Sequence, residues 1–305
     1  MSEGGISARG VRRAFGNVVA LQHIDLDAPA GAVTALVGPN GSGKTTLLLV
    51  LATLLAPDAG HVRVAGFDPV RQARAVRART GWMPDVFGTW GTLTCREVLR
   101  VVTDTHRMPR ARAEARIDDL LGLVHLDDLA DRPTQVLSRG QKQRLGLARA
   151  LVHDPQVVLL DEPASGLDPR SRVELRGIVR DLATAGKAVV VSSHVLSELD
   201  EMADRAVIVA EGCTIAVETL DEVAERPRTW RVRALDEQSL VAALDARGIP
   251  YGEGDRYGRE IEIASDVEAA EVLNALVSDG VPVVAFHPAG GVLERTYLAL
   301  TEDRR

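Results

Sequence analysis

Short apolar runs that end at glycine or polar residues recur in the first two thirds of the chain. Val33–Val37 (VTALV) leads into the stretch GPNGSGKTT and then into an apolar segment from Leu47, a pattern typical of strand, loop and helix. Val157–Leu160 runs directly into Asp161, and Ala188–Val191 ends at the sequence SSH. Near-continuous apolar runs of this kind indicate parallel strands that are covered on both faces.

Two longer segments between these runs have helical periodicity. Arg110–Leu123 and Arg170–Thr184 are rich in alanine and arginine, with larger apolar residues three or four positions apart, as in a helix with one buried face. The alternation of strands, loops and helices predicts an α/β domain over residues 4–222.

The composition changes at Glu225-Arg226-Pro227-Arg228, a charged stretch with proline that we interpret as a linker. Beyond it we expect a small α+β domain over residues 229–305. Its expected elements are strand Trp230–Ala234, helix Gln238–Arg247, strand Tyr251–Asp255, strand Glu260–Ala264, helix Val267–Ser278, strand Val281–Phe286 and helix Val292–Leu300. The first six follow the βαββαβ order of a ferredoxin-like unit.

Composition and charge narrow the class of partner. Hydrophobic residues make up 46% of the 305 residues and aromatic residues only 3%, so we expect a core of Ala, Val and Leu. The formal net charge is −7, whereas nucleic acid is bound by a basic surface. We therefore expect no nucleic-acid partner.

The sequence predicts neither a membrane anchor nor a disulfide. Met1–Arg12 lacks the apolar run of a secretory signal, and the apolar stretch Leu47–Ala56 is well short of the ~20 residues of a membrane helix. Cys95 and Cys213 are far apart and lack metal-ligand spacing, which favours free thiols over a disulfide or a metal pair. Any function at a membrane would need another protein to span it.

A glycine-rich loop is the first candidate for chemistry. The sequence GPNGSGKT fits G-x-x-x-x-G-K-[ST], whose backbone N–H groups surround a phosphate at the positive N-terminus of a helix. By the same chemistry Lys44 would reach the β- and γ-phosphates of ATP, and the Thr45 hydroxyl would bind Mg²⁺. A chance glycine turn is the alternative, which the flanking strand and helix disfavour. The expected nucleotide contacts are Gly38, Pro39, Asn40, Gly41, Ser42, Gly43, Lys44, Thr45 and Thr46.

Two adjacent carboxylates, Asp161 and Glu162, close the second apolar strand. Asp161 suits Mg²⁺, usually through water, and Glu162 could accept a proton from a water molecule that attacks the γ-phosphate. A solvated turn would also place two acids after a strand, but the phosphate loop makes the catalytic interpretation the stronger one. The stretch Leu137–Gln141 (LSRGQ) also fits an ordinary helix start, with Ser138 as N-cap.

From Gly4 to about Asp221 the chain resembles the nucleotide-binding domain of ABC transporters. The resemblance rests on GPNGSGKTT, the signature LSRGQ, the acidic strand VVLLDEP with the loop Ser165–Asp168, and His194 in SSH, all in the order and spacing of the family. The signature together with the acidic strand and the histidine is far more specific than a phosphate loop alone. The resemblance implies a P-loop NTPase fold of the ABC type.

The resemblance also implies a role for each motif. Phe15 would stack on adenine, and His194 would bridge the γ-phosphate, Glu162 and the partner's loop around Asp168. The family works as a head-to-tail homodimer with two composite MgATP sites, each sharing residues of both chains. One chain would supply Lys44, Thr45, Asp161 and Glu162, and the other would contact the γ-phosphate through Ser138, Gly140 and Gln141.

Two positions depart from the family pattern. Arg139 replaces the second glycine of the usual LSGGQ, a tolerable change because its side chain can point away from the phosphate. Asp85, in Trp82-Met83-Pro84-Asp85, stands where the family has a glutamine that contacts Mg²⁺ and the attacking water. An ionised Asp accepts hydrogen bonds but cannot donate them. Asp85 therefore acts either on the metal or water, or only in a loop that contacts a permease.

The motif MPD, with Leu93-Thr94 and Glu97, resembles a branch of the family that serves drug- and polysaccharide-exporting or related two-component systems. The ending Leu293–Thr301 is similar to LEDVFLALT of daunorubicin-resistance-type exporter ATPases, although an ordinary amphipathic helix would give a similar pattern.

By this resemblance the chain is identified as the ATP-hydrolysing subunit of an ABC transporter. We expect it at the cytoplasmic face of the membrane, bound through a separate permease. The transporter is expected to export drugs, antibiotics or similar compounds. A soluble ABC ATPase of translation or DNA repair is the main alternative, but such proteins usually carry two cassettes or a coiled-coil insertion. A regulatory subunit without turnover is disfavoured by Glu162 and His194.

Overall fold

The computed structural model describes residues 4–86, 88, 91–220, 222, 227–291 and 293. The chain divides into two compact units, residues 1–218 and 219–305, and each is described by itself. The tail Leu293–Thr301 and the expected helix Val292–Leu300 lie outside the described residues, except for Leu293.

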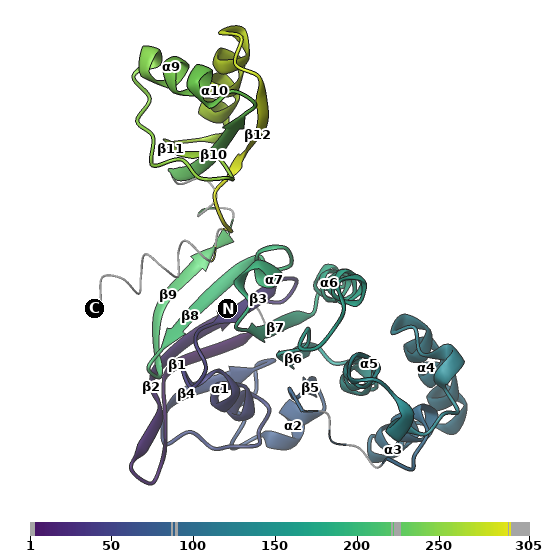
Figure 1. The fold of residues 1–305 in the computed structure, drawn as a ribbon. Coiled ribbons are helices and arrows are strands. Elements are labelled where there is room, and N and C mark those ends of the chain that lie inside the picture. Colours follow the sequence, from purple (N-terminus) through teal and green to yellow (C-terminus); the bar gives the residue numbers. More distant parts are fainter. Residues whose placement is uncertain are drawn as a thin grey trace. The chain divides into compact units, whose positions relative to one another are not determined.

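A nine-stranded sheet forms the frame of the first unit, in the order β4-β1-β2-β9-β8-β3-β7-β6-β5 (Figure 1). Strands β1, β2 and β4 pair antiparallel, whereas β3, β5, β6, β7 and β8 pair parallel. The strands are β1 Ile6–Phe15, β2 Val18–Ala28, β3 Val33–Val37, β4 Ala59–Val64, β5 Thr80–Met83, β6 Val157–Asp161, β7 Ala188–Ser193, β8 Arg205–Ala210 and β9 Cys213–Thr219. All three runs expected as parallel strands are confirmed, and the α/β class with them.

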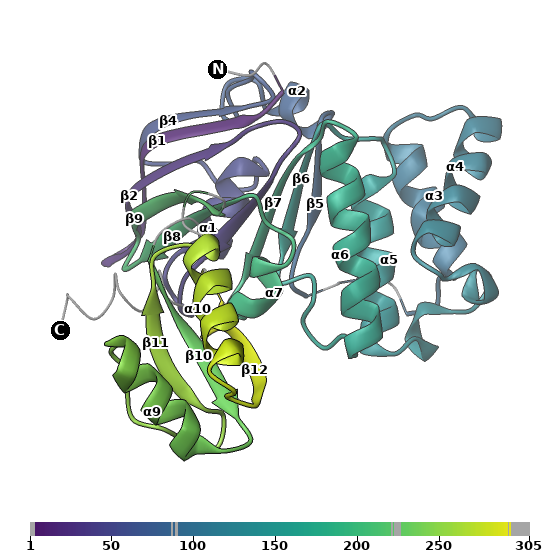
Figure 2. The ribbon, with the colours of Figure 1, turned by 90° about the horizontal axis from the view of Figure 1, so that it is seen from above.

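Helices cover both faces of the parallel strands, which explains why β3, β6 and β7 are apolar throughout. Helix α1 (Lys44–Leu51) lies on one face, where Leu47, Leu48 and Leu51 join a core that also includes side chains of the antiparallel strands. Helix α6 (Pro169–Thr184) contacts β3 and β7, and α5 (Arg139–Leu151) contacts β5 and β6. Figure 2 shows α5 and α6 side by side, with α3 and α4 beyond them.

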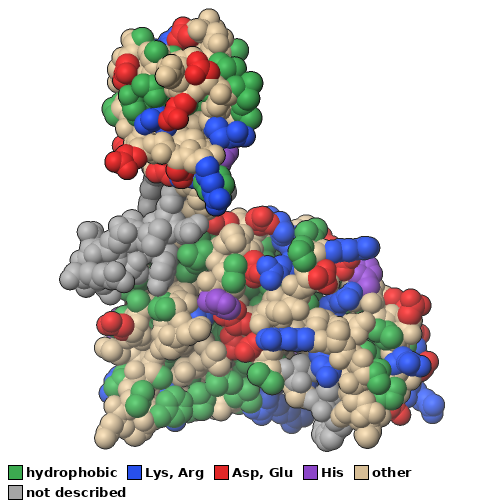
Figure 3. All heavy atoms as spheres, viewed as in Figure 1, with side chains coloured by type: hydrophobic (Ala, Val, Ile, Leu, Met, Phe, Trp, Pro, Cys, Tyr) green, Lys and Arg blue, Asp and Glu red, His purple; other side chains and the backbone are tan. Residues whose placement is uncertain are grey.

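The remaining helices of the first unit are short or lie outside the sheet. Helix α4 has the expected bounds, and α3 begins with a capping box in which Thr94 and Glu97 bond each other's backbone N–H. The bounds are α2 Ala73–Arg77, α3 Cys95–Thr105, α4 Arg110–Leu123 and α7 Leu196–Asp200, with 3₁₀ turns at Asp127–Leu129 and Thr134–Val136. In the view of Figure 3, acidic and basic side chains of this unit lie interspersed.

The second unit is a three-stranded antiparallel sheet, β11-β10-β12, packed on two helices. Its elements are β10 Arg228–Ala234, α9 Glu237–Arg247, β11 Arg259–Ile263, α10 Asp266–Ser278 and β12 Val283–Pro288. The expected strand Tyr251–Asp255 was wrong: only isolated bridges form, from Tyr251 to Ile261 and from Asp255 to Gly258. Glycines 252 and 254 provide no side chains to pack and weaken a strand.

The structure also tests the expected linker and the expected free cysteines. Arg228, placed in the linker by sequence, is the first residue of β10, whereas Glu225 and Arg226 are outside the description. Cys95 is buried and Cys213 partly exposed, and both are free thiols. Within the described ranges, no helix combines the length and the hydropathy needed to cross a membrane.

Candidate functional site

The loop between β3 and α1 can only be built from glycine at its tightest points. A Cβ on Gly38 would lie 2.2 Å from the carbonyl oxygen of Val209, and one on Gly43 would lie 2.7 Å from that of Ala20. Gly41 and Gly43 also have φ of 83° and 104°, in the left-handed region that favours glycine. The motif spacing therefore reflects close backbone packing as well as phosphate chemistry.

Lys44 lies inside this loop and is only 7% exposed. Its Nζ donates hydrogen bonds to the carbonyls of Gly38 at 2.6 Å and Pro39 at 3.1 Å. Burial lowers the pKa of the Lys44 ammonium, while the nearby carboxylates of Glu162 and Asp161 raise it. A buried cation whose partners are mainly carbonyl oxygens is a suitable counter-charge for an incoming anion.

A line of hydrogen bonds joins α1 to the ends of β6 and β7. The Thr45 hydroxyl donates to Asp161 Oδ2 at 2.9 Å, and the Ser192 hydroxyl donates to Asp161 Oδ1 at 2.5 Å. Asp161 is 2% exposed, so both carboxylate oxygens are held in place by neighbours. The three parallel strands thus bring Thr45 and Asp161 together, 116 positions apart in sequence.

Glu162 follows with a backbone φ of 50°, unusual for a residue other than glycine and a form of strain seen at functional sites. Its N–H bonds the carbonyl and the hydroxyl of Ser192, both at 3.1 Å. Its Oε2 is 2.9 Å from Nδ1 of His194, which is more exposed. Burial raises the pKa of the Glu162 carboxyl, and the His194 contact opposes that rise.

Phe15 ends β1 and is 45% exposed, large for an aromatic side chain. It pairs with Val18 across the hairpin that leads into β2. The next part of β2 touches the phosphate loop, because Ala20 and Leu21 approach Gly43 closely. The hairpin that carries Phe15 is therefore packed against the loop that carries Lys44.

The signature residues form a different kind of structure. Ser138 caps α5: its hydroxyl accepts from the Gln141 N–H at 3.2 Å, and the Gln141 side chain accepts from the Ser138 N–H at 2.8 Å. Arg139, the departure from LSGGQ, donates to Ser165 Oγ at 2.8 Å. Among the described residues, no hydrogen bond or ion pair joins Ser138, Gly140 or Gln141 to the phosphate loop.

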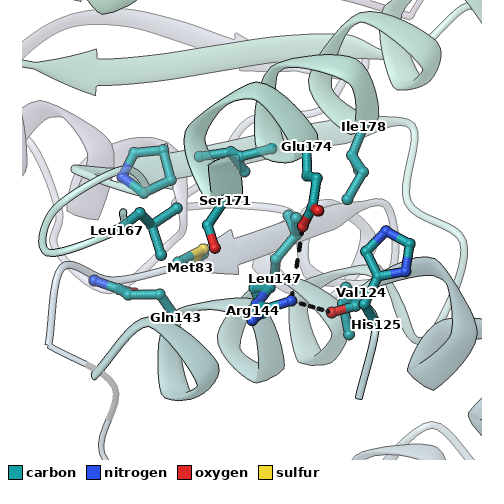
Figure 4. Close-up of a pocket in the computed structure, with 12 residues that line it drawn as sticks. Met83, Val124, His125, Gln143, Arg144, Leu147, Leu167, Ser171, Glu174 and Ile178 are labelled. Atoms are coloured by element: carbon teal, nitrogen blue, oxygen red, sulfur yellow. Dashed lines mark hydrogen bonds and ion pairs between the residues drawn. The ribbon is translucent and has the colours of Figure 1, made fainter. Parts of the chain in front are cut away.

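Behind the signature, α5 packs on α6 across a largely apolar hollow (Figure 4). Leu147 and Leu167 line it from opposite sides, and Arg144 reaches Glu174 at 3.8 Å. Gln143, 4% exposed, donates from Nε2 to the Asp85 carbonyl at 3.1 Å. Helix α5 therefore holds the backbone of the loop that carries Asp85.

The residues expected to bind Mg²⁺ are only partly brought together. Thr45 and Asp161 offer a hydroxyl and a carboxylate in contact, the oxygen donors that Mg²⁺ prefers. The Asp85 carboxylate has no hydrogen-bond or ion-pair partner among the described residues. Nor do those residues contain a cluster of three or more His, Cys, Asp or Glu suited to a metal.

Sequence reasoning missed Ser192, whose hydroxyl links Asp161 to the Glu162 backbone. A serine that closes a fully buried apolar strand was the available signal, since a buried hydroxyl needs a partner. It also missed Arg13, whose guanidinium lies over the Phe15 ring at 4.8 Å. No local pattern distinguishes Arg13 from the other arginines of the chain.

Comparison with known proteins shows the family of the chain. The model of the ABC transporter family matches residues 21–165. Daunorubicin resistance ATP-binding protein DrrA3 of Streptomyces coeruleorubidus is 35% identical, and the match covers 100% of this chain and 98% of that protein. The sulfate/thiosulfate import ATP-binding protein CysA of Thermosynechococcus vestitus is 38% identical, over 73% of this chain and 66% of that protein.

The fold is shared with solved ATP-binding cassettes. A dimeric cassette in a post-hydrolysis state, bound to ADP and Pi, is 25% identical with a TM-score of 0.64, covering 70% of this chain and 98% of that one. The full-length match to DrrA3 and the matched ABC transporter region lead to one conclusion. This chain belongs to the ABC transporter family, as an ATP-binding subunit with ATPase activity.

Proposed function

We propose that this subunit hydrolyses MgATP to drive export of a drug, an antibiotic or a similar compound through a separate membrane permease. The relative that matches along the full chain is named for daunorubicin resistance, which favours export, although a relative named for import matches the ATPase unit. On this proposal the subunit is peripheral, at the cytoplasmic face of the membrane. The observation that carries the proposal is the linked array of Thr45, Asp161, Ser192, Glu162 and His194 beside Lys44.

The phosphate-binding half of the site would work mainly by position and charge. The loop's N–H groups and Lys44 would hold the β- and γ-phosphates, with Lys44 leaving the carbonyls of Gly38 and Pro39. Thr45 and Asp161 would hold Mg²⁺, which when bound neutralises charge that develops on the phosphate oxygens. Because Ser192 fixes Asp161, little reorganisation is needed at the moment of reaction.

Glu162 would act on the attacking water. Burial raises its pKa, which makes it a better proton acceptor while His194 keeps its carboxylate oriented. The exposed His194 ring is free to meet a γ-phosphate on its outer side.

The signature residues would serve the nucleotide of a second chain. In this chain the side chains of Ser138 and Gln141 each accept the other residue's backbone N–H, and we infer that their helix start meets an anion held by another chain. A head-to-tail homodimer would bring it to the partner's γ-phosphate, and the solved dimeric cassette supports such an assembly. We assign Asp85 to permease contact and not to the metal, because among the described residues no hydrogen bond links its carboxylate to Thr45 or Asp161, and only its backbone carbonyl is held, by Gln143.

The test is Glu162→Gln. The amide cannot accept the proton, so turnover should fall about a hundredfold or more, while ATP remains bound. Loss of one negative charge should let a closed dimer accumulate in MgATP, visible by size-exclusion chromatography. Glu114→Gln, which alters a carboxylate on α4 paired with Arg100, is the control. A Glu162→Gln protein that binds ATP but stays monomeric would contradict the composite-site proposal.

A further inference from the structure

The Phe15 ring is covered on one side by a cation that is itself held firmly. The Arg13 guanidinium lies 4.8 Å from the ring centroid, within the range of a cation–π contact. A planar guanidinium stacks on aromatic faces. Since a ring has two faces and Phe15 is 45% exposed, the uncovered face is the one open to a ligand.

Arg13 does not depend on Phe15 for its position. Its Nη1 donates to Asp58 Oδ1 at 2.9 Å and to the Ala56 carbonyl at 3.1 Å. The other oxygen of Asp58 accepts the Ala14 N–H at 2.7 Å, and the Asp58 N–H bonds the Arg12 carbonyl at 2.8 Å. Asp58 thus ties both Arg13 and the strand end that carries Phe15.

Asp58 also connects this strand end to the helix that follows the phosphate loop. Asp58 lies in the segment between α1, which begins at Lys44, and β4. A register irregularity between Arg13 and Ala14 interrupts the regular pairing of β1 with β2 at the same point, and such bulges re-aim side chains. The position of the Phe15 ring is therefore tied, through Asp58, to the segment that follows α1.

We propose that Arg13 is a positioning residue for base binding: its guanidinium backs one face of Phe15 so that a purine base stacks on the opposite face. The inference rests on the proposed role of Phe15 as the adenine platform. Arg13 orients the ring before the nucleotide arrives, which reduces the ordering cost of binding. It touches neither the phosphates nor the reacting atoms.

The experiment compares two probes on the full-length protein: MgATP and magnesium tripolyphosphate, which has no base. Phe15→Ala should weaken MgATP binding roughly tenfold, within the range for base–aromatic stacking. Arg13→Gln should weaken it about two- to fivefold, the scale of an exposed cation–π contact. Neither variant should change tripolyphosphate binding, and the double variant should lose no more than Phe15→Ala alone.

The controls separate this inference from the proposal it rests on. Arg12→Gln removes a neighbouring exposed arginine and should leave both probes unchanged; Arg13→Lys keeps the charge, serves if Arg13→Gln does not fold, and should lie between Arg13→Gln and wild type. If Phe15→Ala binds MgATP normally, the platform itself is wrong. If Phe15→Ala is weakened but Arg13→Gln is not, or if Arg13→Gln weakens tripolyphosphate equally, the role of Arg13 is overturned.

Discussion

The two parts of the proposed ATP site differ in how they are held. The phosphate half comprises Lys44, Thr45, Asp161, Glu162 and His194. Hydrogen bonds link the last four of these across α1, β6 and β7 through Ser192, and Lys44 and Asp161 are buried. The signature half, Ser138, Gly140 and Gln141, is bonded within its own helix start, and none of these three residues is buried. On the proposed model, one chain therefore holds the phosphate half in place by its own hydrogen bonds and leaves its signature half for the nucleotide of a second chain. A site shared between two chains requires this division.

The largest effect should come from the phosphate half. Asp161→Asn removes the charge that Thr45 and Ser192 orient, so phosphate release should fall about a hundredfold or more, ~2.7 kcal/mol of barrier. ATP binding in EDTA should be unaffected, because the change acts through the metal. Asp118→Asn, which alters an exposed partner of Arg96, serves as control. Normal turnover in Asp161→Asn would show that the array is only structural.

A second effect tests how the C-terminal end of α5, the helix that begins at the signature, is held in place. His153, just beyond α5, stacks on His106 at 4.1 Å and bonds the Thr80 carbonyl at 3.2 Å. Burial, with the His106 ring adding to it, lowers the pKa of His153 to about 4. The folded state therefore favours the neutral His153 ring. The contribution of His153 to the free energy of unfolding is complete above about pH 6.5 and is lost as pH falls towards 4.

Denaturant unfolding at pH 7 and pH 5 measures this effect. Wild type should lose about 2 kcal/mol more between these values than His153→Asn, which has no ring to protonate. His61→Asn, on exposed β4, is the control and should follow wild type. Equal losses in wild type and His153→Asn would mean that the α5 anchor does not depend on a neutral His153.

A smaller effect should separate the halves directly. Ser138→Ala loses the α5 cap, about 1 kcal/mol of stability, and should slow turnover about tenfold without weakening ATP binding to a single chain. Ser265→Ala removes the equivalent cap of α10 and should leave turnover unchanged. If Ser138→Ala weakens binding and turnover equally, the signature half acts in its own chain, and the comparison fails.

The smallest effect is expected at Asp85. Its backbone carbonyl is held by Gln143, and its carboxylate has no hydrogen-bond or ion-pair partner in the described part of the chain, so Asp85→Ala should change the isolated ATPase by less than about twofold. Stimulation by the co-expressed permease should disappear. A tenfold loss without permease, ~1.4 kcal/mol, would return Asp85 to the metal or the water.

The sequence by itself predicted the parallel core, which the structure confirms, and the residues proposed for the phosphate half. Apolar runs that end in glycine or acids favour buried strands with chemistry at their carboxyl ends, and parallel strands bring those ends to one edge. Lys44, Thr45 and Asp161 were therefore predictable from local spacing. The strand predicted at Tyr251–Asp255 was wrong, because this segment has too few side chains to pack, and two isolated bridges form in its place.

Only the tertiary structure decided the contacts that join distant segments. Ser192 meets Asp161, Arg139 meets Ser165, and Arg13 lies between Asp58 and Phe15 because strands and loops remote in sequence pass side by side. Periodicity and motifs report how a segment is buried, but a serine or an arginine has many possible partners of equal local plausibility. The choice among them is made by the packing of the whole sheet, which brings one partner within hydrogen-bond distance and excludes the others.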